Sequence, residues 1–238
     1  RPPPRRSLYF DYRVYPAFTA EVGATTVRRE AVVVVGAGPI GLTAALELAR
    51  HGIPSIVLEA EQQVSEGSRA IVFTRRSMEI LQQVGVAGPV SAAGLGWRFG
   101  NSFYRNQRVF RMEAPHDADD RFPPMTNLQQ PCLERELVEA AEANPLVELR
   151  WGNKVIGLTQ ASDHACLEVD TPAGSYRLEG TWVIAADGAR SGLRTLLGLK
   201  LEGAAYEGRF VIADIRIELD LPTERLAYFD PPWNPGNT

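Results

Sequence analysis

The stretch from Ala31 to Gly52 constrains the fold of this chain more than any other. It opens on a run of small and β-branched apolar residues, Ala31 to Val35, which is typical of a strand buried on both faces. The residues from Gly36 to Gly41 follow at once and read GAGPIG, which matches G-x-G-x-x-G. Leu42 to His51 is rich in apolar helix formers, and Gly52 stands where a glycine commonly ends a helix. We therefore expect a strand, a tight turn and a helix in direct succession.

Each glycine of this turn has a separate physical role in a dinucleotide site. Gly36 permits the tight turn, Gly38 lets the backbone approach a pyrophosphate, and Gly41 lets the helix pack close to the sheet. The helix N-terminus adds unpaired N–H groups and the positive end of the helix dipole. Ser55 to Leu58 predicts a second strand, and Glu59 follows it, about 20 residues after the glycines, where a carboxylate receives ribose hydroxyls. A 2′-phosphate would be repelled there, so the pattern favours FAD or NAD over NADP; an α/β turn whose glycines serve packing alone is the other interpretation.

Composition excludes several classes of function. The 238 residues suffice for one large domain or one and a half, and the net charge of −4 does not suggest a nucleic-acid partner. No apolar run reaches the roughly 18 residues that a membrane-spanning helix needs. Cys132 and Cys166 lie far apart, which fits a reducing cytoplasm better than a disulfide framework. The three histidines are scattered, so we expect no metal site.

The remaining patterns predict further helices and an N-terminal arm. Residues 1–30 show no sustained periodicity, so we expect an extended arm that is partly disordered at its start. Thr74 is suited to cap a helix that ends at Gly85, and a shorter helix is expected over 86–93. Another helix begins at Pro131, a residue favoured at the first helical position. A short helix over 191–197 completes the set.

Strands are predicted on both sides of the helix that begins at Pro131. Before it, 97–103 and 108–112 form a hairpin or small sheet. After it, four strands follow in sequence, over 147–151, 154–160, 165–171 and 175–179. We interpret the last three of these as a β-meander inserted into the α/β frame. A buried strand over 182–186 then ends at Asp187-Gly188.

The character of the sequence changes near its C-terminal end. Residues 210–219 alternate like one strand of a half-exposed antiparallel sheet, and 226–229 is suited to be a second strand. Because a two-stranded sheet is marginal alone, we expect a second domain that begins here and is not finished.

Four motifs together resemble one family. They are GAGPIGLTAALELARHGIPSIVLE, GSRAIVFTRRSMEIL, LQQPCLERELVEAA and AADGARSGLR, in this order. Over about Ala31 to Pro232 the chain resembles the class A FAD-dependent aromatic hydroxylases, and especially the branch containing 3-(3-hydroxyphenyl)propionate hydroxylase. The resemblance implies an α/β, Rossmann-like FAD-binding domain over 31–203, with a parallel sheet and the inserted meander, and the start of an antiparallel-sheet substrate domain over 204–238. The family's later Gly-Asp motif has no match after Gly198, so we expect the N-terminal part of such an enzyme.

The resemblance also implies roles for individual residues. Gly36, Gly38 and Gly41 would hold the pyrophosphate and Glu59 the adenosine ribose. The cofactor-binding residues it adds are Arg69 at the FAD pyrophosphate, Gln130 (alternatively Gln129) at the ribityl region, and Asp187 at cofactor hydroxyls. Arg190 and Arg194 would either support the Asp-Gly turn or meet the phosphates of the nicotinamide cofactor. No residue is assigned a catalytic role.

The implied function is that of a flavin-dependent monooxygenase. NAD(P)H would reduce FAD, and O₂ would supply the oxygen atom that is transferred to a phenolic or other aromatic substrate. We expect no nucleic-acid or membrane partner, and a homo-oligomer is left open. Two alternatives remain: another FAD oxidoreductase of the same fold, such as a halogenase or a reductase, or a non-catalytic fragment that binds FAD weakly or not at all.

Overall fold

The computed structural model describes residues 2–67, 71–204, 208, 211–213, 215 and 217–238. Its helices are α1 (Pro39–Arg50), α2 (Arg75–Gln83), α3 (Ala87–Ala93), α4 (Gln130–Glu142) and α5 (Gly192–Leu196). Its strands are β1 (Arg28–Val35), β2 (Ser55–Glu59), β3 (Val72–Thr74), β4 (Leu95–Trp97), β5 (Phe99–Tyr104), β6 (Gln107–Glu113), β7 (Met125–Asn127), β8 (Val147–Trp151), β9 (Lys154–Gln160), β10 (Ala165–Thr171), β11 (Gly174–Ala185) and β12 (Arg225–Phe229). Among the described residues, no helix combines the length and apolarity needed to span a bilayer.

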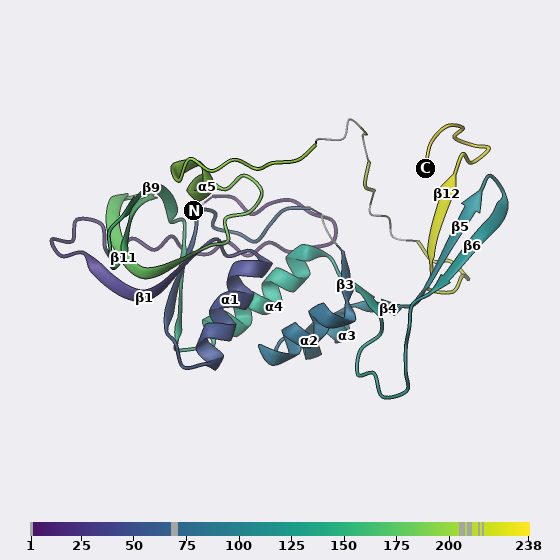
Figure 1. Ribbon diagram of the computed structural model, residues 1–238, viewed down its shortest axis with the longest axis horizontal. Helices are drawn as coiled ribbons and strands as arrows, with labels where there is room; N and C mark the ends of the chain where they lie inside the picture. The colour runs from purple at the N-terminus through teal and green to yellow at the C-terminus, as the bar shows by residue number, and fades with distance from the viewer. Residues whose placement is uncertain (1, 68–70, 205–207, 209–210, 214, 216) are drawn as a thin grey trace.

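The main sheet has six strands in the order β8-β2-β1-β11-β10-β9, and Figure 1 shows its strands β1, β11 and β9 on the left. The strands β8, β2, β1 and β11 run parallel, whereas β10 and β9 continue the sheet antiparallel. The central position of β1, between β2 and β11, explains why its sequence is apolar without alternation. The predicted α/β fold with a parallel sheet and an attached meander is confirmed.

Alternate residues of the central strands enter two separate apolar clusters. Val32 and Val34 of β1 face the cluster that α1 and α4 complete, whereas Val33 and Val35 face a second cluster with residues of β10, β11 and α5. Figure 1 shows α1 and α4 side by side, to the right of the strands β1 and β11. Leu42 of α1 is fully buried in the first cluster. The sheet is therefore covered on both faces.

The predicted meander is found, but its third strand does not end where the sequence predicted. Residues 154–160 and 165–171 form β9 and β10 with the predicted bounds. The strands expected over 175–179 and 182–186 are instead one continuous strand, β11. Gly180 does not interrupt it, because it pairs with Glu30 of β1 on one side and with Ala165 of β10 on the other.

The predicted helices are found with small shifts at their ends. Thr74 caps α2 as expected, since its side chain accepts a hydrogen bond from the N–H of Ser77. The first helix begins at Pro39, three residues before the expected Leu42, and Gly52 follows its end with φ of 73°. Gln130 is the first residue of α4 rather than a residue before it.

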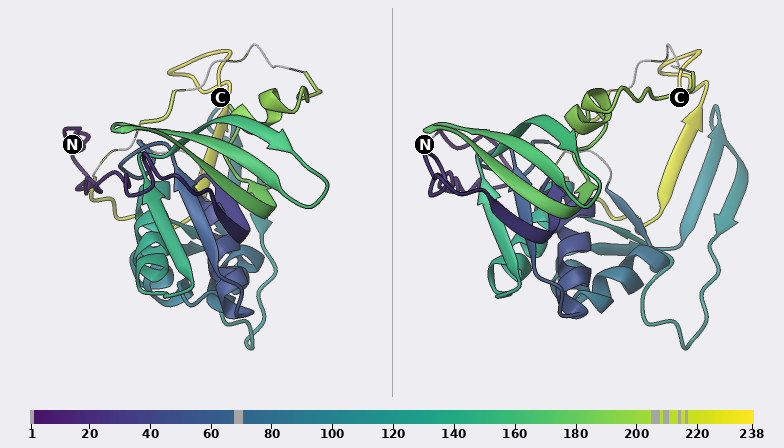
Figure 2. Two further views of the ribbon diagram at one scale, coloured as in Figure 1. Left: turned by 90° about the vertical axis from the view of Figure 1, so that its left-hand side faces the viewer. Right: turned by 60° about the vertical axis from the view of Figure 1, so that its left-hand side comes forward.

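A separate three-stranded sheet, β12-β5-β6, lies at the opposite end of the molecule from β9 and β11 (Figures 1 and 2). The hairpin of β5 and β6 agrees with the prediction, although the expected strand over 97–103 is divided between β4 and β5. The strand predicted over 210–219 is wrong where the structure describes it: Phe210, Asp214 and Arg216 lie outside the described residues, and the others lie in no strand. Strand β12 pairs in parallel with β5.

The N-terminal arm, which precedes β1, packs against the domain. Phe10, Tyr12 and Tyr15 are buried, and Tyr15 stacks on Trp151 with ring centroids 4.2 Å apart. The backbone N–H of Phe18 donates to the carbonyl oxygen of Trp151 at 2.9 Å. The arm thus extends along the edge strand β8. The strand that follows begins at Arg28, three residues earlier than the sequence predicted.

Candidate functional site

The glycine loop after β1 contains two glycines that packing requires and one that faces open space. Gly36 has φ of 104°, and a Cβ there would collide with the carbonyl oxygen of Ala186. A Cβ on Gly41 would collide with the carbonyl oxygen of Gly36. At Gly38, in contrast, no atom lies within 4 Å of the position of a Cβ. The loop therefore leaves open space at Gly38, while Gly36 and Gly41 fix the turn.

Helix α1 begins at this loop with an open N-terminus. Gly38 is its N-cap residue, Pro39 stands in the first turn, and no side chain caps the helix. The first turn also carries no acidic residue. Backbone N–H groups at such an end lack intrahelical partners and are suited to an anion.

Glu59, at the end of β2, lies beside the glycine loop. Its Oε2 accepts a hydrogen bond from the N–H of Ala37 at 2.7 Å, and its Oε1 accepts one from the N–H of Glu61 at 2.9 Å. Burial raises the pKa of Glu59 above its ordinary value, and the two backbone donors oppose this shift. The carboxylate of Glu59 and the glycine loop are therefore in direct contact.

A cleft of about 640 Å³ joins most of the predicted residues. Its lining includes Gly36, Gly38, Glu59, Gln130 and Asp187. The sixth predicted residue, Gly41, is buried beneath the loop. The seventh, Arg69, lies outside the described residues. Five positions spread over some 150 residues of sequence therefore line one cleft, at the carboxyl ends of β1 and β2.

Glu134 is a residue of the cleft that the sequence analysis missed. It is only 2% exposed, and its carboxylate accepts hydrogen bonds from the N–H of Ser65 at 2.6 Å, from the Ser65 hydroxyl at 2.9 Å and from Nε2 of Gln130 at 2.7 Å. The Gln130 amide is thereby oriented, whereas Gln129 is the N-cap residue of α4. The spacing of four residues between Gln130 and Glu134 on a predicted helix was the available signal.

Asp187 lines the cleft and also accepts hydrogen bonds from the start of α5, whose N-cap residue is Ser191. Its Oδ1 accepts from the hydroxyl of Ser191 at 2.6 Å and its Oδ2 from the N–H of Leu193 at 3.0 Å. Arg194 donates to the carbonyl oxygen of Ala189 at 2.9 Å and so supports the turn, whereas Arg190 is exposed and lines the cleft.

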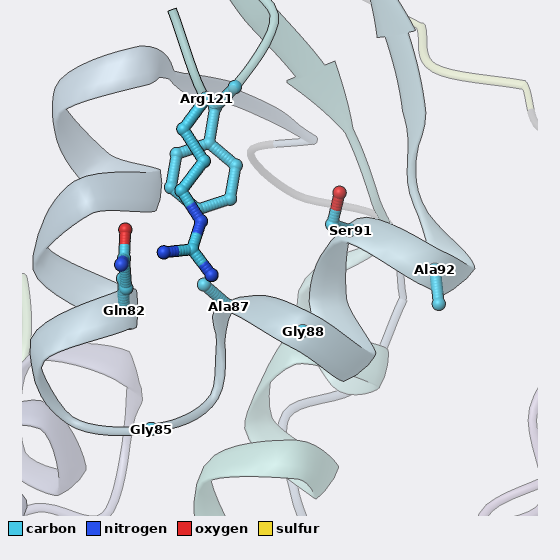
Figure 3. Close-up of a pocket in the computed structure, with 8 residues that line it drawn as sticks. Gln82, Gly85, Ala87, Gly88, Ser91, Ala92 and Arg121 are labelled. Carbon is cyan, nitrogen blue, oxygen red and sulfur yellow. The ribbon is translucent and has the colours of Figure 1, made fainter.

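A second cavity of about 600 Å³ lies between α2 and α3 and shares no lining residue with the cleft. Figure 3 shows the Arg121 guanidinium directed between Gln82 and Ala87. Gly88 lies on the same wall. None of the described residues that were predicted to bind a cofactor lines this cavity. Its residues can therefore serve as control positions for mutations in the cleft.

The fold and the site define a dinucleotide-binding α/β protein. The defining features are the parallel sheet, the glycine loop after β1, the open N-terminus of α1 and the acidic residue at the end of β2. The family model described as FAD binding domain matches residues 29–229, and the chain belongs to this family.

Curated relatives of this chain are named as monooxygenases and hydroxylases. The chain is 30% identical over 198 residues to para-nitrophenol 4-monooxygenase of Pseudomonas sp. (strain WBC-3), covering 81% of this chain and 48% of that protein. It is 31% identical over 205 residues to 3-(3-hydroxy-phenyl)propionate/3-hydroxycinnamic acid hydroxylase of Burkholderia cenocepacia (strain HI2424), covering 85% and 38%. The chain spans about half, or less, of the length of these relatives.

Solved structures agree with this assignment. The crystal structure of p-nitrophenol 4-monooxygenase PnpA from Pseudomonas putida DLL-E4 superposes with a TM-score of 0.69 at 33% identity, over 76% of this chain and 46% of that one. The flavin-dependent monooxygenase PieE, in complex with FAD and substrate, gives a TM-score of 0.66 at 30% identity, over 74% and 33%.

Proposed function

We propose that the cleft binds FAD with its diphosphate on the glycine loop. The single observation that carries this is the empty space at Gly38, which adjoins the uncapped N-terminus of α1. A helix dipole contributes only about 0.3–1 kcal/mol for each anion. Direct N–H bonds from the loop and the first turn of α1 therefore supply most of the diphosphate affinity.

The other residues of the cleft fit the rest of the cofactor. Glu59 receives the adenosine ribose hydroxyls, and its two backbone donors hold the carboxylate in place. Gln130, oriented by Glu134, donates its amide to the ribityl chain. Asp187 accepts a further hydroxyl while it holds the start of α5 through Ser191 and Leu193. Gly41 contributes indirectly, by allowing α1 to approach the loop. For Arg69 a pyrophosphate contact stays a prediction.

We propose aromatic hydroxylation as the activity of the whole protein. Bound FAD would supply the redox chemistry: two electrons from NAD(P)H would reduce O₂, so that one oxygen atom enters the ring of a small aromatic substrate and the other leaves as water. The names of the relatives support a phenol or a related aromatic acid as the substrate class. The two unpaired cysteines support a cytoplasmic location, and homo-oligomerisation stays a prediction.

The test has two parts, because cofactor binding and turnover are separable. Purified protein is titrated with FAD and followed by flavin fluorescence, and saturable binding is expected. The full-length gene product is then assayed for NADH and NADPH oxidation with and without para-nitrophenol and 3-(3-hydroxyphenyl)propionate, and a hydroxylated product is expected. Binding with a halogenated product or with no oxygenated product would favour another FAD oxidoreductase, and absence of FAD binding would refute the proposal.

A further inference from the structure

We propose that the N-terminal arm is part of the cofactor site, with Arg5 as a positioning residue for the segment 61–67. The inference rests on the proposed binding of FAD. Residues 1–28 lie outside the family match, which begins at residue 29, so the FAD-binding family does not account for the arm. In this protein the arm nevertheless reaches the cleft.

The arm is fixed at its far end by the edge of the sheet. Arg150 of β8 is completely buried and donates to Glu21 of the arm at 2.8 Å and to the hydroxyl of Tyr176 at 3.0 Å. The Arg150 guanidinium also lies 4.2 Å from the ring centroid of Phe18. Together with the stacking of Tyr15 on Trp151, these contacts define the path of the arm along β8.

The anchored arm contacts the segment 61–67 through Arg5. The backbone N–H of Arg5 donates to Oε1 of Gln63 at 2.8 Å, and the Arg5 guanidinium donates to the carbonyl oxygen of Val64 and, at 3.2 Å, to Glu61. Glu66 forms a further ion pair with Arg5 at 3.9 Å. Arg5 thus bridges several residues of one loop.

The arm holds the same segment at its other end through Tyr12. The Tyr12 hydroxyl donates to the carbonyl oxygen of Ser65 at 3.4 Å and accepts from the N–H of Gly67 at 3.2 Å. Ser65 is the residue that contacts both Glu134 and Gln130 in the cleft. The arm therefore acts on the cleft through the residues between Glu61 and Gly67.

A cavity of about 320 Å³ shows the consequence for the cofactor. Its lining combines Arg5 and Glu66 with Gly38, Glu59 and Arg190, all but the first two of which also line the main cleft. Glu61 also lines this cavity, so two acidic residues, Glu61 and Glu66, lie at it. Arg5 neutralises them at the side where a diphosphate on Gly38 would otherwise be repelled.

The test compares Arg5→Ala with Arg6→Ala in the full-length protein. Arg6 is exposed and makes no hydrogen bond or ion pair within the part of the chain that the structure describes, so it is the matched control. We expect Arg5→Ala to raise the Kd for FAD about fivefold, the scale of one partly exposed ion-pair cluster, and Arg6→Ala to leave it unchanged. Faster cleavage of apo Arg5→Ala by a glutamate-specific protease at Glu61 or Glu66 is also expected.

A charge role has a signature that a purely structural role lacks. The difference in Kd between Arg5→Ala and wild type narrows as NaCl is raised to about 0.5 M, and the double variant Arg5→Ala/Glu61→Gln recovers part of the affinity. Equal Kd values for Arg5→Ala and Arg6→Ala, with normal binding by wild type, would overturn this inference alone. Failure of wild type to bind FAD would instead overturn the proposed function, and this inference with it.

Discussion

The glycine-loop unit from β1 to β2 and the C-terminal segment 199–221 are both rich in apolar residues, yet they have opposite environments. In the first, Val33, Val34 and Val57 are completely buried between neighbouring strands and helices. In the second, the large apolar residues whose side chains are described are exposed: Leu199, Leu201, Val211, Ile212, Ile215, Ile217, Leu219 and Leu221. An apolar pattern specifies a strand only where a neighbouring strand and a covering face are available to bury it.

The largest difference between the two regions is expected for a leucine truncated in each. Leu42→Ala removes a completely buried side chain against α4 and should lower the free energy of unfolding by about 3 kcal/mol. Leu201→Ala removes a side chain that is 80% exposed and should change it by less than about 0.5 kcal/mol. Urea unfolding of both variants measures the contrast. Equal losses would mean that the C-terminal segment has a buried face after all.

Within the glycine loop, a smaller contrast separates packing from binding. Gly41→Ala places a Cβ against the Gly36 carbonyl and should destabilise the fold by about 2 kcal/mol, after the usual gain in helix propensity. Gly38→Ala meets no atom and should cost less than about 1 kcal/mol as an N-cap change. Thermal unfolding of the apo proteins distinguishes them, and the reverse order of stability would show that the loop packs differently.

The buried carboxylate of Glu134 should give the next effect. Glu134→Gln retains the shape but leaves one acceptor where Ser65 and Gln130 present three donor groups, so a loss of about 1.5 kcal/mol in stability is expected. Weaker FAD binding should accompany it, because Gln130 loses its orientation. Glu136→Gln, on the same helix and outside the cleft lining, is the control. An unaltered Kd in Glu134→Gln would remove Gln130 from the proposed site.

These contrasts also explain what the sequence could predict. The unit from β1 to Glu59 was predictable because its contacts are local: strand, turn, helix and carboxylate follow one another within about thirty residues. The bounds of β8, β9 and β10 were likewise predictable from alternation and turn residues. In each case the pattern lies within a short stretch of sequence, even though β1 and β8 also pair with strands far away in the chain.

Three of the misses depend on partners that are distant in sequence. In the sequence, Glu134 is indistinguishable from a charged residue on a helix surface. Its partner Ser65 lies 69 residues away, and only the fold brings the two together. The parallel pairing of β12 with β5 joins segments more than 120 residues apart. The pattern of apolar residues in either strand does not predict which strand it pairs with. The contacts of Arg5 could likewise not be predicted from a motif, because the path of the arm determines which residues of 61–66 it meets.

The smallest expected effect concerns the pH dependence of Glu59. Burial raises its pKa, so the native state binds more protons than the unfolded state between the unfolded and folded pKa values. The contribution of Glu59 to stability therefore falls as pH rises through the folded pKa and improves as pH is lowered. As the pH is lowered from 7 to 4, the free energy of unfolding of the apo wild-type protein should rise relative to that of Glu59→Gln. FAD affinity should change in the opposite sense, because protonation removes a hydroxyl acceptor.

The account depends most directly on the diphosphate lying against Gly38. FAD titration of Gly38→Asp measures this, with Gly88→Asp as the matched control: a Cβ at either glycine meets no atom within 4 Å, but Gly88 lines the remote cavity of Figure 3. A carboxylate at position 38 would repel the diphosphate and occupy its space, so binding should become undetectable, at least about a hundredfold weaker, while Gly88→Asp binds like wild type. Retention of wild-type affinity by folded Gly38→Asp would contradict the proposed site.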